Sequence, residues 1–180
     1  MVKRIATVIA LCACVQAFPL GIACRASQVS YEELRRTYIP QSSPEASYRL
    51  EYELMLKGMY CYDLPLFDPD WRRKGREIIF SSAYRQTAQG FDAPFMSRIE
   101  GSYAVIYYPD NKDLGPVFLY RDRSGWVVDR TSVMDNITYS SSNKEWFAQD
   151  GDYPYLAILK RAFSMEKVRL NSGAWAYRVR

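Results

Sequence analysis

Residues 101–128 read GSYAVIYYPDNKDLGPVFLYRDRSGWVV, and this stretch decides the fold class that the sequence predicts. It contains three apolar runs, Tyr103–Tyr108, Val117–Tyr120 and Trp126–Val128, which are separated by segments rich in Asp, Asn, Gly and Pro. Short runs of Val, Ile, Tyr and Phe between such turn residues are typical of consecutive antiparallel strands. We therefore predict a β-meander, with Trp126 buried in its core.

Helix signals precede this stretch. Ser30-Tyr31-Glu32-Glu33 has the spacing of a capping box, which predicts a short helix to about Tyr38. Ser43-Pro44 combines a hydroxyl N-cap with proline at the first helical position, and we expect a helix from Pro44 to about Tyr60. The aromatic and methionine residues that follow recur every three or four positions, as on one helical face: Tyr48, Tyr52, Met55, Met59 and Tyr62.

Four further elements are predicted from local patterns. Asp70 is a candidate N-cap for a second helix, from Trp71 to about Ala88. Ile137–Phe147 is expected to form a hairpin, and Pro154–Phe163 a short helix. Ala174–Val179 is expected to form the last strand.

These elements predict an α+β fold with N-terminal helices packed on a curved antiparallel β-sheet. The chain has 180 residues and 48% hydrophobic residues, which suits one domain with short additional segments. We divide it into a signal peptide at 1–23, an N-terminal arm or linker at 24–43, and a single α+β domain at 44–180.

Helices followed by a meander, whose late hairpin carries Gly-Trp-Val-Val-Asp at 125–129, resemble the NTF2-like superfamily over residues 44–147. The resemblance implies that N-terminal helices close the concave side of a curved sheet and form a conical pocket. No catalytic motif of an enzymatic member can be placed on these positions. The resemblance therefore implies no active-site residue.

The N-terminus predicts export. Met1-Val2-Lys3-Arg4 is basic, and Ile5–Val15 is an apolar segment too short to span a bilayer but of the length found in signal peptides. We expect the mature protein in the periplasm, or anchored on the membrane of the cell envelope through lipid alone.

Two routes of processing are compatible with the sequence. Val15-Gln16-Ala17 suits cleavage by signal peptidase before Phe18. Alternatively, Leu20-Gly21-Ile22-Ala23-Cys24 resembles a bacterial lipoprotein box, although Gly21 stands where the pattern has Leu. The segment Leu11-Cys12-Ala13-Cys14 matches that pattern better, with a shorter leader.

The route decides the chemistry of the remaining cysteines. If Cys24 is not acylated, Cys24 and Cys61 form an even pair in an oxidising compartment, and a disulfide is expected. If Cys24 is lipidated, Cys61 is a lone thiol, expected to be buried as a small apolar residue.

The chain contains no histidine, which excludes Ser-His-Asp and Cys-His catalysis and removes the commonest zinc ligand. We predict no metal, no cofactor and no defined catalytic residue. Loss of Lys3 and Arg4 with the leader lowers the net charge from +4 to +2, which argues against nucleic-acid binding.

The sequence therefore favours a non-catalytic binding module that takes an unidentified protein partner or a small apolar ligand. A small acid–base enzyme with a tyrosine-lined pocket is the alternative, and its candidate carboxylates are Glu51, Glu53 and Glu100. A secreted inhibitor or an immunity-type protein is a third possibility.

Overall fold

The computed structural model describes residues 29–140 and 145–180, and these residues form an α+β fold, as predicted. The helices are α1 (Tyr31–Thr37), α2 (Pro44–Leu56), α3 (Pro69–Arg72), α4 (Ser82–Gly90), α5 (Arg130–Asn136) and α6 (Pro154–Ala162). The strands are β1 (Met59–Cys61), β2 (Ile78–Phe80), β3 (Met96–Glu100), β4 (Tyr103–Tyr107), β5 (Val117–Asp122), β6 (Gly125–Val128), β7 (Ile137–Ser140), β8 (Glu145–Gln149), β9 (Met165–Arg169) and β10 (Trp175–Val179). The predicted signal peptide, its candidate cleavage positions, Cys14 and Cys24 lie outside the described residues.

The predicted meander is the central sheet. Its strands follow the order β3-β4-β5-β6, and every neighbouring pair is antiparallel. A second antiparallel sheet has the order β7-β8-β10-β9, which confirms the predicted hairpin and the predicted last strand. Strands β1 and β2 pair separately.

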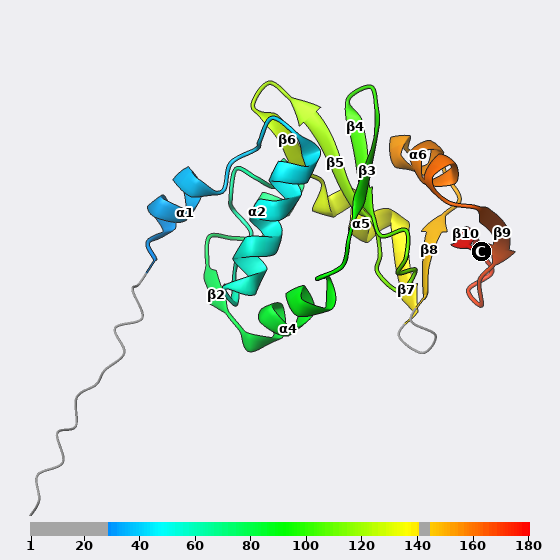
Figure 1. Cartoon of the computed structure of the whole chain (residues 1–180), viewed down its shortest axis with the longest axis horizontal. Coiled ribbons are helices and arrows are strands. Elements are labelled where there is room, and N and C mark those ends of the chain that lie inside the picture. Colours follow the sequence, from blue (N-terminus) through cyan, green and yellow to red (C-terminus); the bar gives the residue numbers. More distant parts are fainter. Residues whose placement is uncertain (1–28, 141–144) are drawn as a thin grey trace, which may run out of the picture.

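The central sheet is buried on both faces along most of β4 and the first half of β5. On β4, Ala104 and Ile106 belong to a first core, shared with α2, whereas Val105 and Tyr107 belong to a second core, shared with α6 and β8. Alternate residues of a strand point to opposite faces, so a strand with two covered faces has a continuous apolar sequence. This explains why Tyr103–Tyr108 is an unbroken apolar run. Figure 1 shows the central sheet between α2 and α6.

Residues 148–180 complete the second core. The buried residues of α6 are Tyr155, Leu156, Ile158 and Leu159. The ring of Tyr155 stacks on that of Phe118 from β5, with ring centroids 4.2 Å apart and planes at 8°. The C-terminal part of the chain is therefore integral to the fold, because it covers a sheet face that would otherwise expose apolar side chains.

Helix α2 is joined to the edge strand β6 by hydrogen bonds as well as apolar contacts. The hydroxyl of Ser47 donates to the carbonyl oxygen of Trp126 at 2.6 Å and accepts from the backbone N–H of Gln41 at 2.8 Å. Trp126 is buried, as predicted, and belongs to the first core. A Cβ at Gly125 would lie 2.5 Å from the carbonyl oxygen of Gln41, so this close approach requires glycine.

The predicted helix from Trp71 to Ala88 is wrong. The segment forms α3, β2 and α4 instead, and Asp68 rather than Asp70 caps the first of these helices. Gly75 adopts a φ of 135°, which interrupts the helix, and Ile78–Phe80 pairs with β1. The helix that begins at Pro44 likewise ends at Leu56, short of the predicted Tyr60, because Gly58 takes a φ of 69° and Met59 starts β1.

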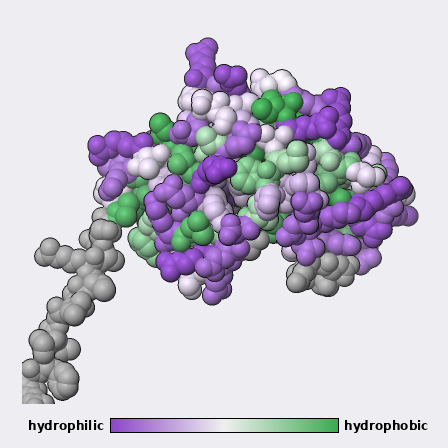
Figure 2. All heavy atoms as spheres, in the orientation of Figure 1, coloured by the Kyte–Doolittle hydropathy of each residue, from purple (hydrophilic) through white to green (hydrophobic). Residues whose placement is uncertain are grey.

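Hydrophilic residues occupy much of the face seen in Figure 2, and hydrophobic residues form groups between them. Among the residues that the structure describes, no helix combines the length and the hydropathy that crossing a membrane requires.

Candidate ligand-binding cavity

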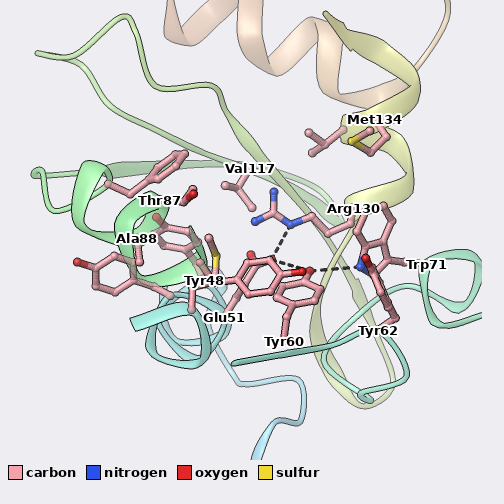
Figure 3. A pocket seen from close by; sticks show the side chains of 15 residues that line it. Tyr48, Glu51, Tyr60, Tyr62, Trp71, Thr87, Ala88, Val117, Arg130 and Met134 are labelled. Carbon is pink, nitrogen blue, oxygen red and sulfur yellow. Dashed lines mark hydrogen bonds and ion pairs between the residues drawn. The ribbon is translucent and has the colours of Figure 1, made fainter. Parts of the chain in front are cut away.

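A cavity of about 250 Å³ lies where α2, α4 and α5 meet beside the central sheet (Figure 3). Its wall is mainly aromatic, with side chains from several segments: Tyr48, Tyr52, Tyr60, Tyr62, Tyr84 and Phe91. Val117 of β5 and Val133 of α5 add aliphatic surface. A concave site with an apolar lining and few polar groups is the usual form of a small-molecule binding site.

The aromatic wall is held together by ring contacts. Tyr60 stacks on Tyr84 with ring centroids 5.2 Å apart, and Tyr62 meets Trp71 edge-on at 5.5 Å. Aromatic pairs in such geometries contribute about 0.5–1.5 kcal/mol beyond their buried area. The wall therefore has a defined shape before any ligand enters.

Glu51 and Arg130 form an ion pair in this aromatic setting. Nε of Arg130 donates to Oε1 of Glu51 at 2.5 Å, and the hydroxyl of Tyr60 donates to the same oxygen at 3.4 Å. Nε1 of Trp71 in turn donates to the Tyr60 hydroxyl at 3.2 Å, so that the dashed lines of Figure 3 run without a break from Arg130 to Trp71. Glu51 is fully buried, and the Arg130 side chain is 22% exposed.

The position of Arg130 follows from two buried carboxylates. Asp129 follows β6 directly and caps α5, because its Oδ1 accepts from the backbone N–H of Ser132 at 2.9 Å. Asp68 accepts from the backbone N–H of Thr131 at 3.1 Å and from its hydroxyl at 2.7 Å. Two caps thus hold the first turn of α5, which begins with Arg130.

Tyr48 and Tyr60 on the cavity wall are neutral at physiological pH. Burial raises the pKa of Tyr48 to about 12, against the opposing effect of its hydrogen bond with the hydroxyl of Tyr108. Burial, followed by the charge of Glu51, raises the pKa of Tyr60 as well. The formal charges on the cavity wall are therefore those of Glu51 and Arg130, which cancel.

The three carboxylates named from the sequence do not converge. Glu51 lines the cavity, but Glu53 pairs with Lys57 at 2.5 Å on the exposed side of α2. Glu100 lies on β3 and pairs with Arg161 of α6 at 2.7 Å. Of the three candidates, Glu51 alone therefore lies at the cavity.

Sequence reasoning missed Arg130, which is separated from Glu51 by 79 positions. The signal for Glu51 was present, since it follows Tyr48 by three residues and precedes Met55 by four, and so lies on the apolar face of α2. No local pattern distinguishes Arg130 from any other basic residue in a first helical turn.

Cys61 is fully buried, and its thiol donates to the carbonyl oxygen of Arg76 at 3.7 Å. Burial raises the pKa of this thiol, which lowers its reactivity. Its proposed partner Cys24 lies outside the described residues, so the disulfide stays a prediction. Within residues 29–140 and 145–180, no group of three or more His, Cys, Asp or Glu side chains is arranged to hold a metal ion.

No protein-family model, curated protein sequence or solved structure matches the chain. The resemblance to the NTF2-like superfamily over residues 44–147 therefore stays a prediction. What the structure defines is an α+β protein with an aromatic cavity that contains one buried ion pair.

Proposed function

We propose that this chain is an exported, non-catalytic binding protein that takes a small, largely apolar ligand into the cavity between α2, α4 and α5. The observation that carries the proposal is the aromatic wall around about 250 Å³ of space. A dry apolar cavity of about 150 Å³ is sufficient to bind benzene. A cavity of the present size thus suits a two-ring molecule.

The charge pattern supports binding over acid–base catalysis. Glu51 is the carboxylate on the cavity wall, and it is engaged by the guanidinium of Arg130. Removing one partner of a buried ion pair is strongly destabilising, so Glu51 and Arg130 are a fixed part of the wall. Carboxylate and guanidinium groups that engage each other in this way are better suited to shaping a binding site than to acting on a substrate.

The N-terminal sequence supports a place of action outside the cytoplasm. The basic start and the apolar segment Ile5–Val15 support export, with the mature protein in the periplasm or lipid-anchored on the envelope. An apolar ligand of a protein in that compartment would be captured from outside the cytoplasm.

Calorimetric titration with naphthalene, an uncharged two-ring probe, tests the binding function. Thr87 lines the cavity with an exposed side chain, so Thr87→Phe should narrow the entrance without disturbing the cores. Gln86→Phe, on the same helix at an exposed position outside the cavity, is the matched control. We expect naphthalene to bind the parent chain and the control alike, and Thr87→Phe to weaken binding about tenfold or more.

Absence of naphthalene binding to the folded parent chain would contradict the proposed function. Equal binding to all three proteins would also contradict it, because the bound probe would then lie outside the cavity.

A further inference from the structure

Arg130 carries the accessible polar atoms of the ion pair on the cavity wall. Its side chain is 22% exposed, whereas that of Glu51 is fully enclosed. Nε of Arg130 is used in the bond to Glu51, but the two terminal nitrogens donate no hydrogen bond to any described residue. Unlike the enclosed Oε2 of Glu51, these nitrogens retain accessible surface. In Figure 3 they point away from Trp71 and toward Val117, which lines the cavity.

This unused edge of the guanidinium can be used only by a hydrogen-bond acceptor, because a guanidinium has N–H donors and no acceptor atom. Other donors on the wall are weaker or already engaged. The hydroxyl of Tyr48 is bonded to that of Tyr108. The hydroxyl of Tyr60 donates to Glu51. Hydrogen bonds from ionised donors are roughly twice as strong as those between neutral groups, so the guanidinium dominates the polar part of recognition.

The balance of charge sets a second condition. Glu51 and Arg130 neutralise each other, and the neighbouring phenols of Tyr48 and Tyr60 stay protonated. A ligand that brought a carboxylate to Arg130 would place two anionic groups around one guanidinium in a poorly solvated site, which is unfavourable. A neutral acceptor avoids this cost.

Resting on the proposed function, we infer that the cavity binds a neutral two-ring aromatic molecule with a carbonyl oxygen on one edge, which accepts from the terminal N–H groups of Arg130. The rings lie against the aromatic wall. The ligand needs no donor of its own, because the carboxylate of Glu51 is enclosed and out of its reach.

Three two-ring probes of nearly equal size test the inference on the unmodified chain by calorimetry. Tetralone carries the carbonyl group, tetralin has a methylene group in its place, and naphthoate carries a carboxylate. We expect tetralone to bind about tenfold or more tightly than either of the other two.

The outcomes separate the two proposals. If tetralin binds as tightly as tetralone, the carbonyl inference is overturned while the binding function stands. If naphthoate binds as tightly as tetralone or more tightly, the requirement for a neutral ligand is overturned. If no probe binds the folded chain, both proposals fail.

Arg130→Lys tests the role of the guanidinium, because a lysine keeps a positive charge for Glu51 but lacks the terminal N–H groups that point into the cavity. We expect this variant to lose the preference for tetralone over tetralin. Arg123→Lys, at an exposed position between β5 and β6, is the matched control and should keep that preference. An unchanged preference in Arg130→Lys would overturn the role of Arg130.

If Arg130→Lys does not fold, the double variant Glu51→Gln/Arg130→Met takes its place. It removes both charges together, and so leaves no unpaired buried charge. The preference for tetralone should again be lost, and its persistence would overturn the role of Arg130. The comparison of the three probes on the parent chain decides the requirement for a carbonyl group in either case.

Discussion

The hydroxyl of Tyr155 donates a hydrogen bond of 2.8 Å to Oδ2 of Asp129, and both residues are buried. Tyr155 belongs to α6 in the second core, whereas Asp129 caps the helix that begins with Arg130. This hydrogen bond therefore connects α6 to the start of α5, across the central sheet. The start of α5 in turn places the guanidinium of Arg130 at the cavity.

Tyr155→Phe should lower the free energy of unfolding by about 1.5–3 kcal/mol, the range for a hydrogen bond to a charged group. Urea denaturation would measure the change. Tyr153→Phe is the matched control, since the Tyr153 hydroxyl is buried without a hydrogen-bond partner among the described residues, and its removal should cost nothing. An equal loss in both variants would show that the Asp129 contact is not stabilising.

Trp126→Ala should destabilise the protein by about 3–5 kcal/mol, because it leaves a large cavity in the first core. Trp126 is 3% exposed, whereas Trp175, at the start of β10 in the second sheet, is 51% exposed. Trp175→Ala should therefore cost less than about 1 kcal/mol. Comparable losses in thermal unfolding of the two variants would contradict the placement of the core under α2.

Alkaline pH should unfold the protein. Burial raises the pKa of Tyr48 and of Tyr120 to about 12, from an ordinary value of 10.0. The unfolded chain releases these protons first, so their contribution to stability is complete below pH 10 and is lost as the pH rises toward 12.

Tyrosinate absorbance and circular dichroism, followed together, would measure this transition. We expect some of the fifteen tyrosines to ionise only as the secondary structure is lost. In Tyr48→Phe, the free energy of unfolding should fall less steeply with pH between 10.0 and about 12, the ordinary and the raised pKa of Tyr48. Ionisation of every tyrosine near pH 10 with the fold intact would refute the expectation.

Mass spectrometry of the protein from cells should find an N-terminus at Phe18, or at a lipid-modified Cys24 or Cys14. An intact Met1 in the mature protein would contradict export.

Alkylation under denaturing, non-reducing conditions separates the two fates of Cys61, which is too deeply buried to react in the folded state. Cleavage before Phe18 predicts that Cys24 and Cys61 are both protected in a disulfide. Such a bridge closes a loop of a few dozen residues and should stabilise the fold by roughly 3–4 kcal/mol. Lipidation of Cys24 predicts a free Cys61.

The sequence by itself determined the elements whose signals are local. Turn residues separate the apolar runs of 101–128, and Ser43-Pro44 starts α2, so the meander and this helix could be predicted. The burial of Trp126 followed from the same pattern, because a tryptophan that opens a Val-Val strand belongs to the apolar side of a hairpin. Together, these local signals predict the α+β fold class.

Tertiary structure alone decided the segments whose partners are distant. Ile78–Phe80 is a strand because β1 lies beside it, although a helix also satisfied its local pattern. Glu51 faces Arg130 because two caps orient α5 against α2, and no short-range rule relates residues 79 positions apart. Hydrogen bonds and ion pairs across the fold depend on where the backbone brings side chains together, which is why the cavity chemistry emerged only with the structure.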